Sequence, residues 1–146
     1  MQHTKDATYL NIGGNIMDVN LIKRMDIIWV DFGNQRLKGS IQSGLRPAVV
    51  VSNNVGNRHS GILEVATILD NMDEYLRVIP LTSKEKRSMP THLWIEGFGL
   101  KGRSLILGEQ ITTVSKMQVK NIVGRITDDE IIDKINKIIQ ISLGLK

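Results

Sequence analysis

The segment Gly44-Leu45-Arg46-Pro47-Ala48-Val49-Val50-Val51-Ser52 indicates the fold, because it joins a polar loop to a run of strand-forming residues. A proline is tolerated at the first position of a strand, where the ladder needs no donor, and it pushes the preceding residue toward an extended backbone. The segment therefore predicts a strand that opens at Pro47 and carries Arg46 at its loop end.

Short apolar runs of the same kind recur on both sides of this segment. Further strands are predicted over Asp26–Phe32, Tyr75–Leu81, His92–Ile95, Ser104–Leu107 and Ile111–Val114. Gly33–Gly44 and Asn53–Ser60 have the polar, glycine-containing composition of loops. Ile62–Leu69 fits a helix and a strand equally well, so its structure stays open.

Helical signals are confined to the end of the chain. Ser115 can cap a short helix through about Val123, and Thr127-Asp128-Asp129-Glu130 has the form of a capping box. Apolar residues then recur at three- and four-residue spacing, up to a stop at Gly144. They are Ile131, Ile132, Ile135, Ile138, Ile139 and Leu143. We predict a mainly β or α+β protein, with a small, strongly bent sheet and a C-terminal helix.

Length and composition narrow the possible functions. The 146 residues fit one domain, which we place at residues 25–146, and residues 1–24 are predicted to be a loosely ordered extension. The absence of cysteine excludes disulfides, thiolate metal sites and a cysteine nucleophile. No apolar run approaches the roughly 20 residues of a membrane span, and no leader is present, so we expect a soluble, cytoplasmic protein. No metal or cofactor motif is found.

Positive charge gathers in the predicted loops. The net charge is +4, and Asp31–Ser60 holds four basic residues against one acid. Thr82–Arg103 is also basic, with Lys84, Lys86, Arg87, Lys101 and Arg103 against two acids. Basic surfaces bind phosphates through counterion release, which favours a nucleic-acid partner, although a solvated surface without function would give the same count.

Four stretches together resemble one family: Gly44–Ser52, Pro80-Leu81-Thr82-Ser83, Pro90-Thr91-His92 and Leu107-Gly108-Glu109-Gln110-Ile111. From Met25 to Lys146 the chain is similar to the MazF/PemK-type toxins, small endoribonucleases of type II toxin-antitoxin systems. The resemblance implies an SH3-like barrel of that type and a homodimer. It also implies sequence-selective, metal-independent cleavage of single-stranded RNA, leaving a 2′,3′-cyclic phosphate and a 5′-hydroxyl, and inhibition by a cognate antitoxin.

The candidate catalytic residues combine chemistry with this resemblance. Arginine offers two parallel donors to phosphate oxygens, and the family's catalytic Arg-Pro motif falls on Arg46-Pro47. Thr82 and Ser83 supply hydroxyls, and the family's threonine motif falls on Thr82. Arg46 could instead make a surface salt bridge, and Thr82 and Ser83 could instead cap a turn. The RNA-binding candidates are Lys38, Gln42, Ser43, Lys84, Lys86, Arg87 and Gln110.

Two departures from the family bear on mechanism. Many relatives carry glutamate where this chain has Ile41, and isoleucine cannot transfer a proton. Glu109 is the preferred substitute for proton transfer, with Ser83 as a partner and His59 as a second possibility. Gly61–Tyr75 resembles an insertion. The missing glutamate leaves an alternative function, a non-catalytic toxin of the same fold that inhibits a protein such as gyrase by binding.

Overall fold

The computed structural model describes residues 9–12, 15–18, 21–33, 44–52 and 75–145. Nine strands, two short 3-10 helices and one α-helix follow each other within these ranges. In chain order they are β1 (Tyr9–Ile12), β2 (Asn15–Asp18), β3 (Asp26–Asp31), β4 (Leu45–Val50), β5 (Tyr75–Thr82), β6 (His92–Ile95), β7 (Ser104–Leu107), η5 (Gly108–Gln110), β8 (Thr112–Ser115), η6 (Lys116–Gln118), β9 (Val119–Arg125) and α3 (Asp129–Ser142).

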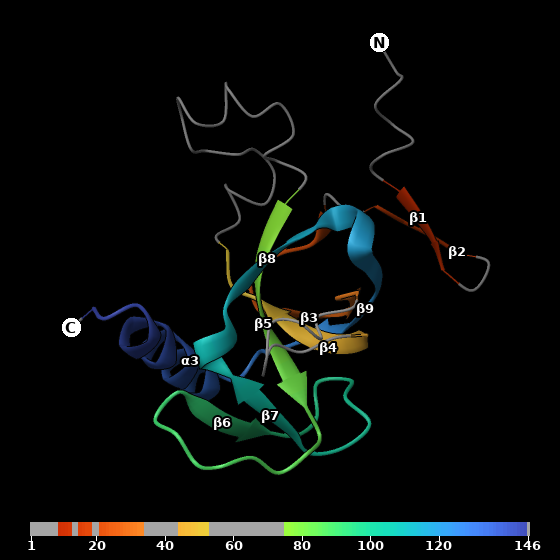
Figure 1. The fold of residues 1–146 in the computed structure, drawn as a ribbon. Helices are drawn as coiled ribbons and strands as arrows, with labels where there is room; N and C mark the ends of the chain where they lie inside the picture. Colours follow the sequence, from red (N-terminus) through yellow and green to blue (C-terminus); the bar gives the residue numbers. More distant parts are fainter. Residues whose placement is uncertain (1–8, 13–14, 19–20, 34–43, 53–74, 146) are drawn as a thin grey trace, which may run out of the picture.

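Seven strands form one antiparallel sheet: six follow the order β6-β7-β5-β4-β3-β9, and the seventh, β8, pairs with β5 outside this order (Figure 1). The long strand β5 bends the sheet, because its first half pairs with β8 and its last two residues, Leu81 and Thr82, pair with β7. Strands β6 and β9 end the order without pairing to each other, so the sheet is strongly bent but not closed. The prediction of a small bent antiparallel sheet with a C-terminal helix is therefore confirmed.

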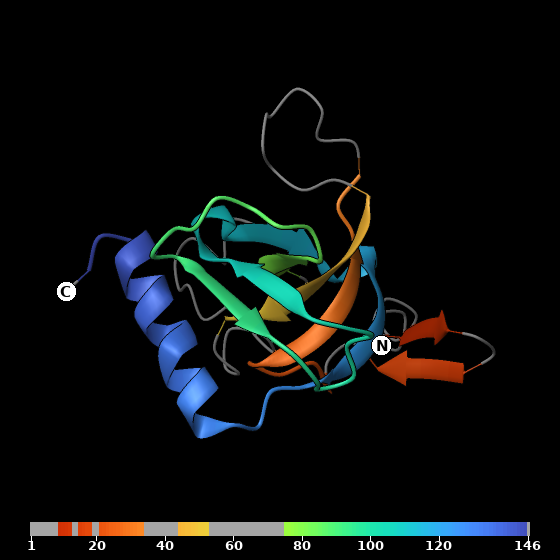
Figure 2. The ribbon, with the colours of Figure 1, turned by 90° about the horizontal axis from the view of Figure 1, so that it is seen from below.

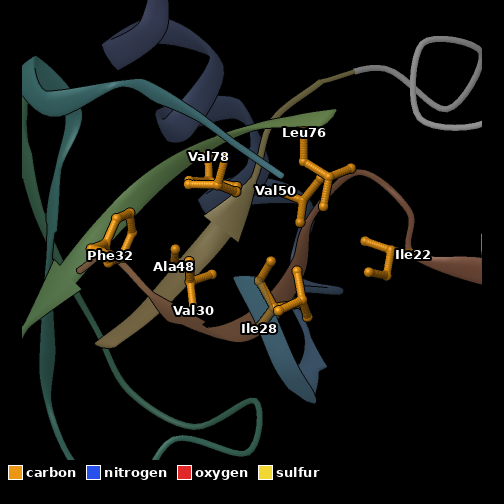
Figure 3. Close-up of a cluster of buried hydrophobic side chains, with 10 residues drawn as sticks. Ile22, Ile28, Val30, Phe32, Ala48, Val50, Leu76 and Val78 are labelled. Carbon is orange, nitrogen blue, oxygen red and sulfur yellow. The ribbon is translucent and has the colours of Figure 1, made fainter. Parts of the chain in front are cut away.

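Both faces of the central strands are buried, which explains their continuous apolar runs. One cluster of side chains contains Ile28, Val30, Ala48, Val50 and Val78, which lie together on one face of the bent sheet (Figure 3). The alternate residues of the same strands, such as Ile27, Val49 and Ile79, face the other way and pack with Ile135 of α3. The sheet thus divides the apolar core into two layers.

Helix α3 lies along one side of the sheet, opposite the hairpin formed by β1 and β2 (Figure 2). Its isoleucine stripe faces the core as predicted, with Ile135 and Ile138 buried, and Gly144 follows its end with a φ of 74°. The N-cap is Asp128, whose carboxylate accepts hydrogen bonds from the amides of Glu130 and Ile131. The capping residue is therefore one position later than the sequence pattern suggested.

One other segment differs from the sequence prediction. Ser115 caps a helix, but only the single turn of η6, and Val119–Arg125 continues as strand β9 because it pairs with β3.

Within residues 1–24, β1 and β2 pair with each other, and Ile22 is 1% exposed in the first core cluster. Arg24 also donates to the carbonyl of Val51 and to Asn136. Ile22 and Arg24, just before the predicted domain, thus contact its core.

No helix within the described ranges is long and apolar enough to span a membrane.

Candidate RNA-cleavage site

A cavity of about 280 Å³ opens where β4, the end of β5 and the β6–β7 loop meet. Three of the predicted catalytic residues line it: Arg46, Thr82 and Ser83. The other lining residues are Trp29, Leu45, Pro47, Leu81, Gly99, Leu100, Lys101, Gly102, Arg103, Ser104 and Val123. Side chains of Arg46, Lys101 and Arg103 make this lining basic, and none of its described residues is acidic.

The antiparallel register of β4 and β5 brings Arg46 and Thr82 together. Ala48 is paired with Pro80, and the same register continued by two residues places Arg46 opposite Thr82. Directly opposed residues of an antiparallel pair project from the same face of the sheet. The guanidinium and the hydroxyl therefore belong to one side of the sheet, at the end where the loop enters β4.

Thr82 is held in a fixed environment. It is 2% exposed, and its Oγ1 accepts a hydrogen bond from the amide of Lys84 at 3.2 Å. Since that bond uses a lone pair, the hydroxyl hydrogen remains available to donate to a ligand. Ser83 is exposed beside it at the mouth of the cavity, so the turn after β5 presents two hydroxyls.

The β6–β7 loop forms the facing wall and is anchored to β9. Gly97, Phe98 and Gly99 have φ angles of 95°, 56° and 90°. A β-carbon at Gly99 would overlap the Val123 backbone, and one at Gly124 would overlap the Phe98 carbonyl, so the two backbones touch. This contact fixes the wall that carries Lys101 and Arg103.

Glu109 lies elsewhere. The Thr91 hydroxyl donates to its Oε1 at 3.0 Å, and His92 Nε2 lies 3.1 Å from its Oε2. Strand β7 begins at Ser104, which lines the cavity, and ends at Leu107. Glu109 follows this second end of the strand. The strand alone separates them by roughly 10 Å. The structure does not bring Glu109 to Arg46 and Thr82.

The surroundings of Glu109 also favour its ionised form. Burial raises the pKa of this carboxyl, but the hydrogen bonds from His92, its own backbone amide and Thr91, with the charge of His92, lower it more. The net shift of the Glu109 pKa is downward. A carboxylate of this kind is a weak base and is not protonated near neutral pH.

Of the remaining predicted residues, those that the structure describes do not line the cavity. Lys84, Lys86 and Arg87 are exposed on the loop after β5, and Gln110 is half-buried in η5. Lys38, Gln42, Ser43, Ile41 and His59 lie outside the described residues, as does most of the predicted insertion. Within the described part of the chain, no group of three histidine, aspartate or glutamate side chains could hold a metal ion.

Sequence reasoning missed the wall formed by the β6–β7 loop. Lys101 and Arg103 were counted in a basic stretch, but their place in the cavity depends on how the loop crosses β9. Trp29 also lines the cavity and is only partly buried. The sequence signal that could have indicated this wall is the pair Lys101 and Arg103 beside the glycines of residues 97–103.

Comparisons with known proteins agree with this architecture. The family model described as PemK-like, MazF-like toxin of type II toxin-antitoxin system matches residues 23–77 and 67–143. The chain is 34% identical over 127 residues to "Endoribonuclease EndoA" of Bacillus subtilis, covering 86% of this chain and 97% of that protein. It is 32% identical to "Endoribonuclease MazF" of Staphylococcus epidermidis, with 86% and 93% covered.

A solved structure shares the fold. It is an endoribonuclease in complex with its cognate antitoxin from Mycobacterial species, with a TM-score of 0.63 and 24% identity. The match covers 86% of this chain and 97% of that one. The sheet order, the C-terminal helix and the sequence matches lead to one conclusion: this chain belongs to the family of PemK-like, MazF-like toxins of type II toxin-antitoxin systems.

Proposed function

We propose that the protein is the endoribonuclease toxin of a type II toxin-antitoxin system and cleaves single-stranded RNA at the Arg46–Thr82 cavity. The main observation in favour of this site is that Arg46, Thr82 and Ser83 line one basic cavity, whose lining holds no acid among the residues that the structure describes. Two relatives of more than 30% identity are named endoribonucleases, which favours this function over a toxin that acts by binding alone.

In the proposed reaction, the RNA supplies its own nucleophile. The 2′-hydroxyl attacks the adjacent phosphorus and the 5′-oxygen of the next nucleotide leaves, which gives a 2′,3′-cyclic phosphate and a 5′-hydroxyl. Arg46 donates two hydrogen bonds to the non-bridging oxygens and stabilises the charge that develops on them. The Thr82 hydroxyl, oriented by the Lys84 amide, donates a further bond.

Proton transfer is assigned to the solvent side of the cavity. The described lining contains hydroxyl groups but no carboxylate or imidazole, so water and the exposed Ser83 hydroxyl carry protons between RNA and solvent. Glu109 takes no direct part in this scheme, because it lies at the other end of β7 and is bonded to Thr91 and His92.

The proposed partners follow from the family. The protein would act in the cytoplasm as a homodimer, and a cognate antitoxin would inhibit it by covering the basic cavity with an acidic segment. Lys84, Lys86 and Arg87 would bind the RNA backbone outside the cavity, as would Lys38, Gln42, Ser43 and Gln110 where RNA reaches them.

The decisive experiment is cleavage of a long single-stranded RNA in the presence of EDTA. We expect discrete fragments with 5′-hydroxyl ends, and we expect Arg46→Ala to lower the cleavage rate by about a hundredfold or more. Lys137→Gln is the matched control, since it removes one exposed positive charge from α3, away from the cavity. Intact RNA with the wild-type protein would overturn the proposed function.

A further inference from the structure

We infer that the β6–β7 loop is a second phosphate-binding wall, on which Arg103 and Lys101 bind the RNA phosphate next to the one that is cleaved. This inference rests on the proposed function and names the part of the substrate that contacts the wall facing Arg46. It concerns residues that sequence reasoning did not include among the RNA-binding candidates.

The orientation of Arg103 is the first argument. Its guanidinium carbon lies 4.0 Å from the centre of the Trp94 ring, so the two groups form a cation–π pair. The Trp94 ring has no hydrogen-bond acceptor, so this pair leaves the guanidinium N–H groups available to a phosphate. Since Arg103 also lines the cavity, Trp94 orients a set of donors without using them.

The charge balance of the wall is the second argument. None of the ion pairs found among the described residues involves Lys101 or Arg103, and both side chains are exposed. Together with Arg46 they place three cations around one cavity whose described lining holds no acid. One phosphate would occupy Arg46 and Thr82, which leaves two cations for the neighbouring phosphate of the same strand.

The β6–β7 loop is held in place before any RNA binds. The Leu100 amide donates to the Gly97 carbonyl at 3.0 Å, and the Ser104 hydroxyl donates to the Gly102 carbonyl at 3.2 Å. The backbone contacts of Gly99 and Gly124 hold the same loop against β9. A preorganised wall binds a ligand without the loss of loop entropy that a flexible segment would incur.

Binding is tested with the RNA sequence found by mapping the ends of the cleaved fragments, made with a 2′-deoxyribose at the cleaved position so that it stays intact. Anisotropy measures its Kd at several salt concentrations. For single strands, each phosphate contact contributes about −0.7 to the slope of log K against log salt. We expect Arg103→Gln to flatten the slope by about 0.7 and to raise Kd about tenfold. Lys137→Gln should leave both values unchanged.

Kinetics distinguish this binding role from that of Arg46. Arg103→Gln should raise KM about tenfold with kcat nearly unchanged, as expected when binding common to substrate and transition state is lost. Arg103→Lys should keep the salt slope. Trp94→Leu should raise KM about threefold, and Trp94→Tyr should restore it because the ring face returns.

The outcomes separate the two proposals. If the wild type cleaves RNA but Arg103→Gln keeps the wild-type Kd, salt slope and KM, the second wall is wrong and the proposed function stands. If kcat falls while the salt slope is unchanged, Arg103 does not bind a phosphate and the inference is also wrong. If the wild type cleaves no RNA, the proposed function fails and this inference fails with it.

Discussion

Arg46 on β4 and Thr82 on β5 lie in the same cavity, and the register of the two strands places them opposite each other. The chain between them is 35 residues long, and much of it is outside the described ranges. Backbone pairing between the strands, rather than the intervening loop, therefore sets the distance between guanidinium and hydroxyl. A site built on paired strands is held more firmly than one carried by loops alone.

The Thr82 hydroxyl can be tested by a nearly isosteric change. Thr82→Val should lower kcat about tenfold or more, because it removes a donor to the phosphate in the transition state. Thr82→Ser should recover most of the rate, since it restores the hydroxyl. Thr113→Val, at an exposed position of β8, is the matched control. Full activity of Thr82→Val would remove Thr82 from the proposed mechanism.

The Glu109 cluster predicts a pH-dependent contribution to stability. Because the folded-state pKa of Glu109 is lowered, its stabilising effect is complete above the ordinary pKa of 4.5 and is lost as the pH falls through the folded value. Glu109→Gln should therefore reduce the free energy of unfolding at pH 7, by less than about 1 kcal/mol for a partly exposed group. The difference from wild type should vanish in acid. Denaturant unfolding at pH 7 and pH 3 measures it.

The same variant tests the location of the chemistry. Glu109→Gln should keep the cleavage rate within about threefold of wild type, because the carboxylate is remote from the cavity, and each tenfold change would require about 1.4 kcal/mol. If Glu109 were the general base, the rate would fall far more. Its lowered pKa would then also make the wild-type rate level off below neutral pH.

Gly108 is predicted to be intolerant of any side chain. A β-carbon there would overlap Ile138 of α3 and lie 2.7 Å from the Thr91 carbonyl oxygen. Gly108→Ala should lower the free energy of unfolding by about 1–3 kcal/mol, the usual cost of overpacking. Gly102→Ala has open space around its β-carbon and provides the control. Equal thermal midpoints for the two variants would show that α3 does not pack closely on η5.

Arg125 and Asp26 connect β9 to β3. Asp26 is 2% exposed, and its Oδ1 accepts from Arg125 Nε at 2.7 Å while its Oδ2 accepts from the Lys23 amide. Arg125→Gln would remove the positive charge that is paired with the buried Asp26 carboxylate. We therefore expect the free energy of unfolding to fall by about 1.5–3 kcal/mol. Lys120→Gln, at another exposed position of the same strand, should change stability by less than about 0.5 kcal/mol. Urea unfolding of both variants makes the comparison.

The sequence was most informative where one local pattern determined one element. The isoleucine spacing predicted α3 and its buried face, and Arg46 and Thr82 were predicted from short motifs next to strands. Val119–Arg125 was misread because the cap at Ser115 is real, whereas the pairing with β3 that makes a strand of the next residues is not visible locally.

The sites of Glu109 and Arg103 could not be separated by sequence alone. Both residues flank β7, and a sequence does not reveal that one end of this strand faces the cavity while the other faces α3. Arg103 also depends on the tertiary contact with Trp94, which lies nine positions earlier and comes close only when β6 and β7 pair. Such contacts require the fold before they can be recognised.

The backbone contact of Gly99 with Val123, and of Gly124 with Phe98, leaves no room for a hinge beneath the cationic loop. When RNA meets this loop, the nucleotide chain has to unstack and rotate to fit a wall that is held against β9. Cleavage would then favour pliable RNA over rigidly stacked RNA, even where the bases at the cut are the same.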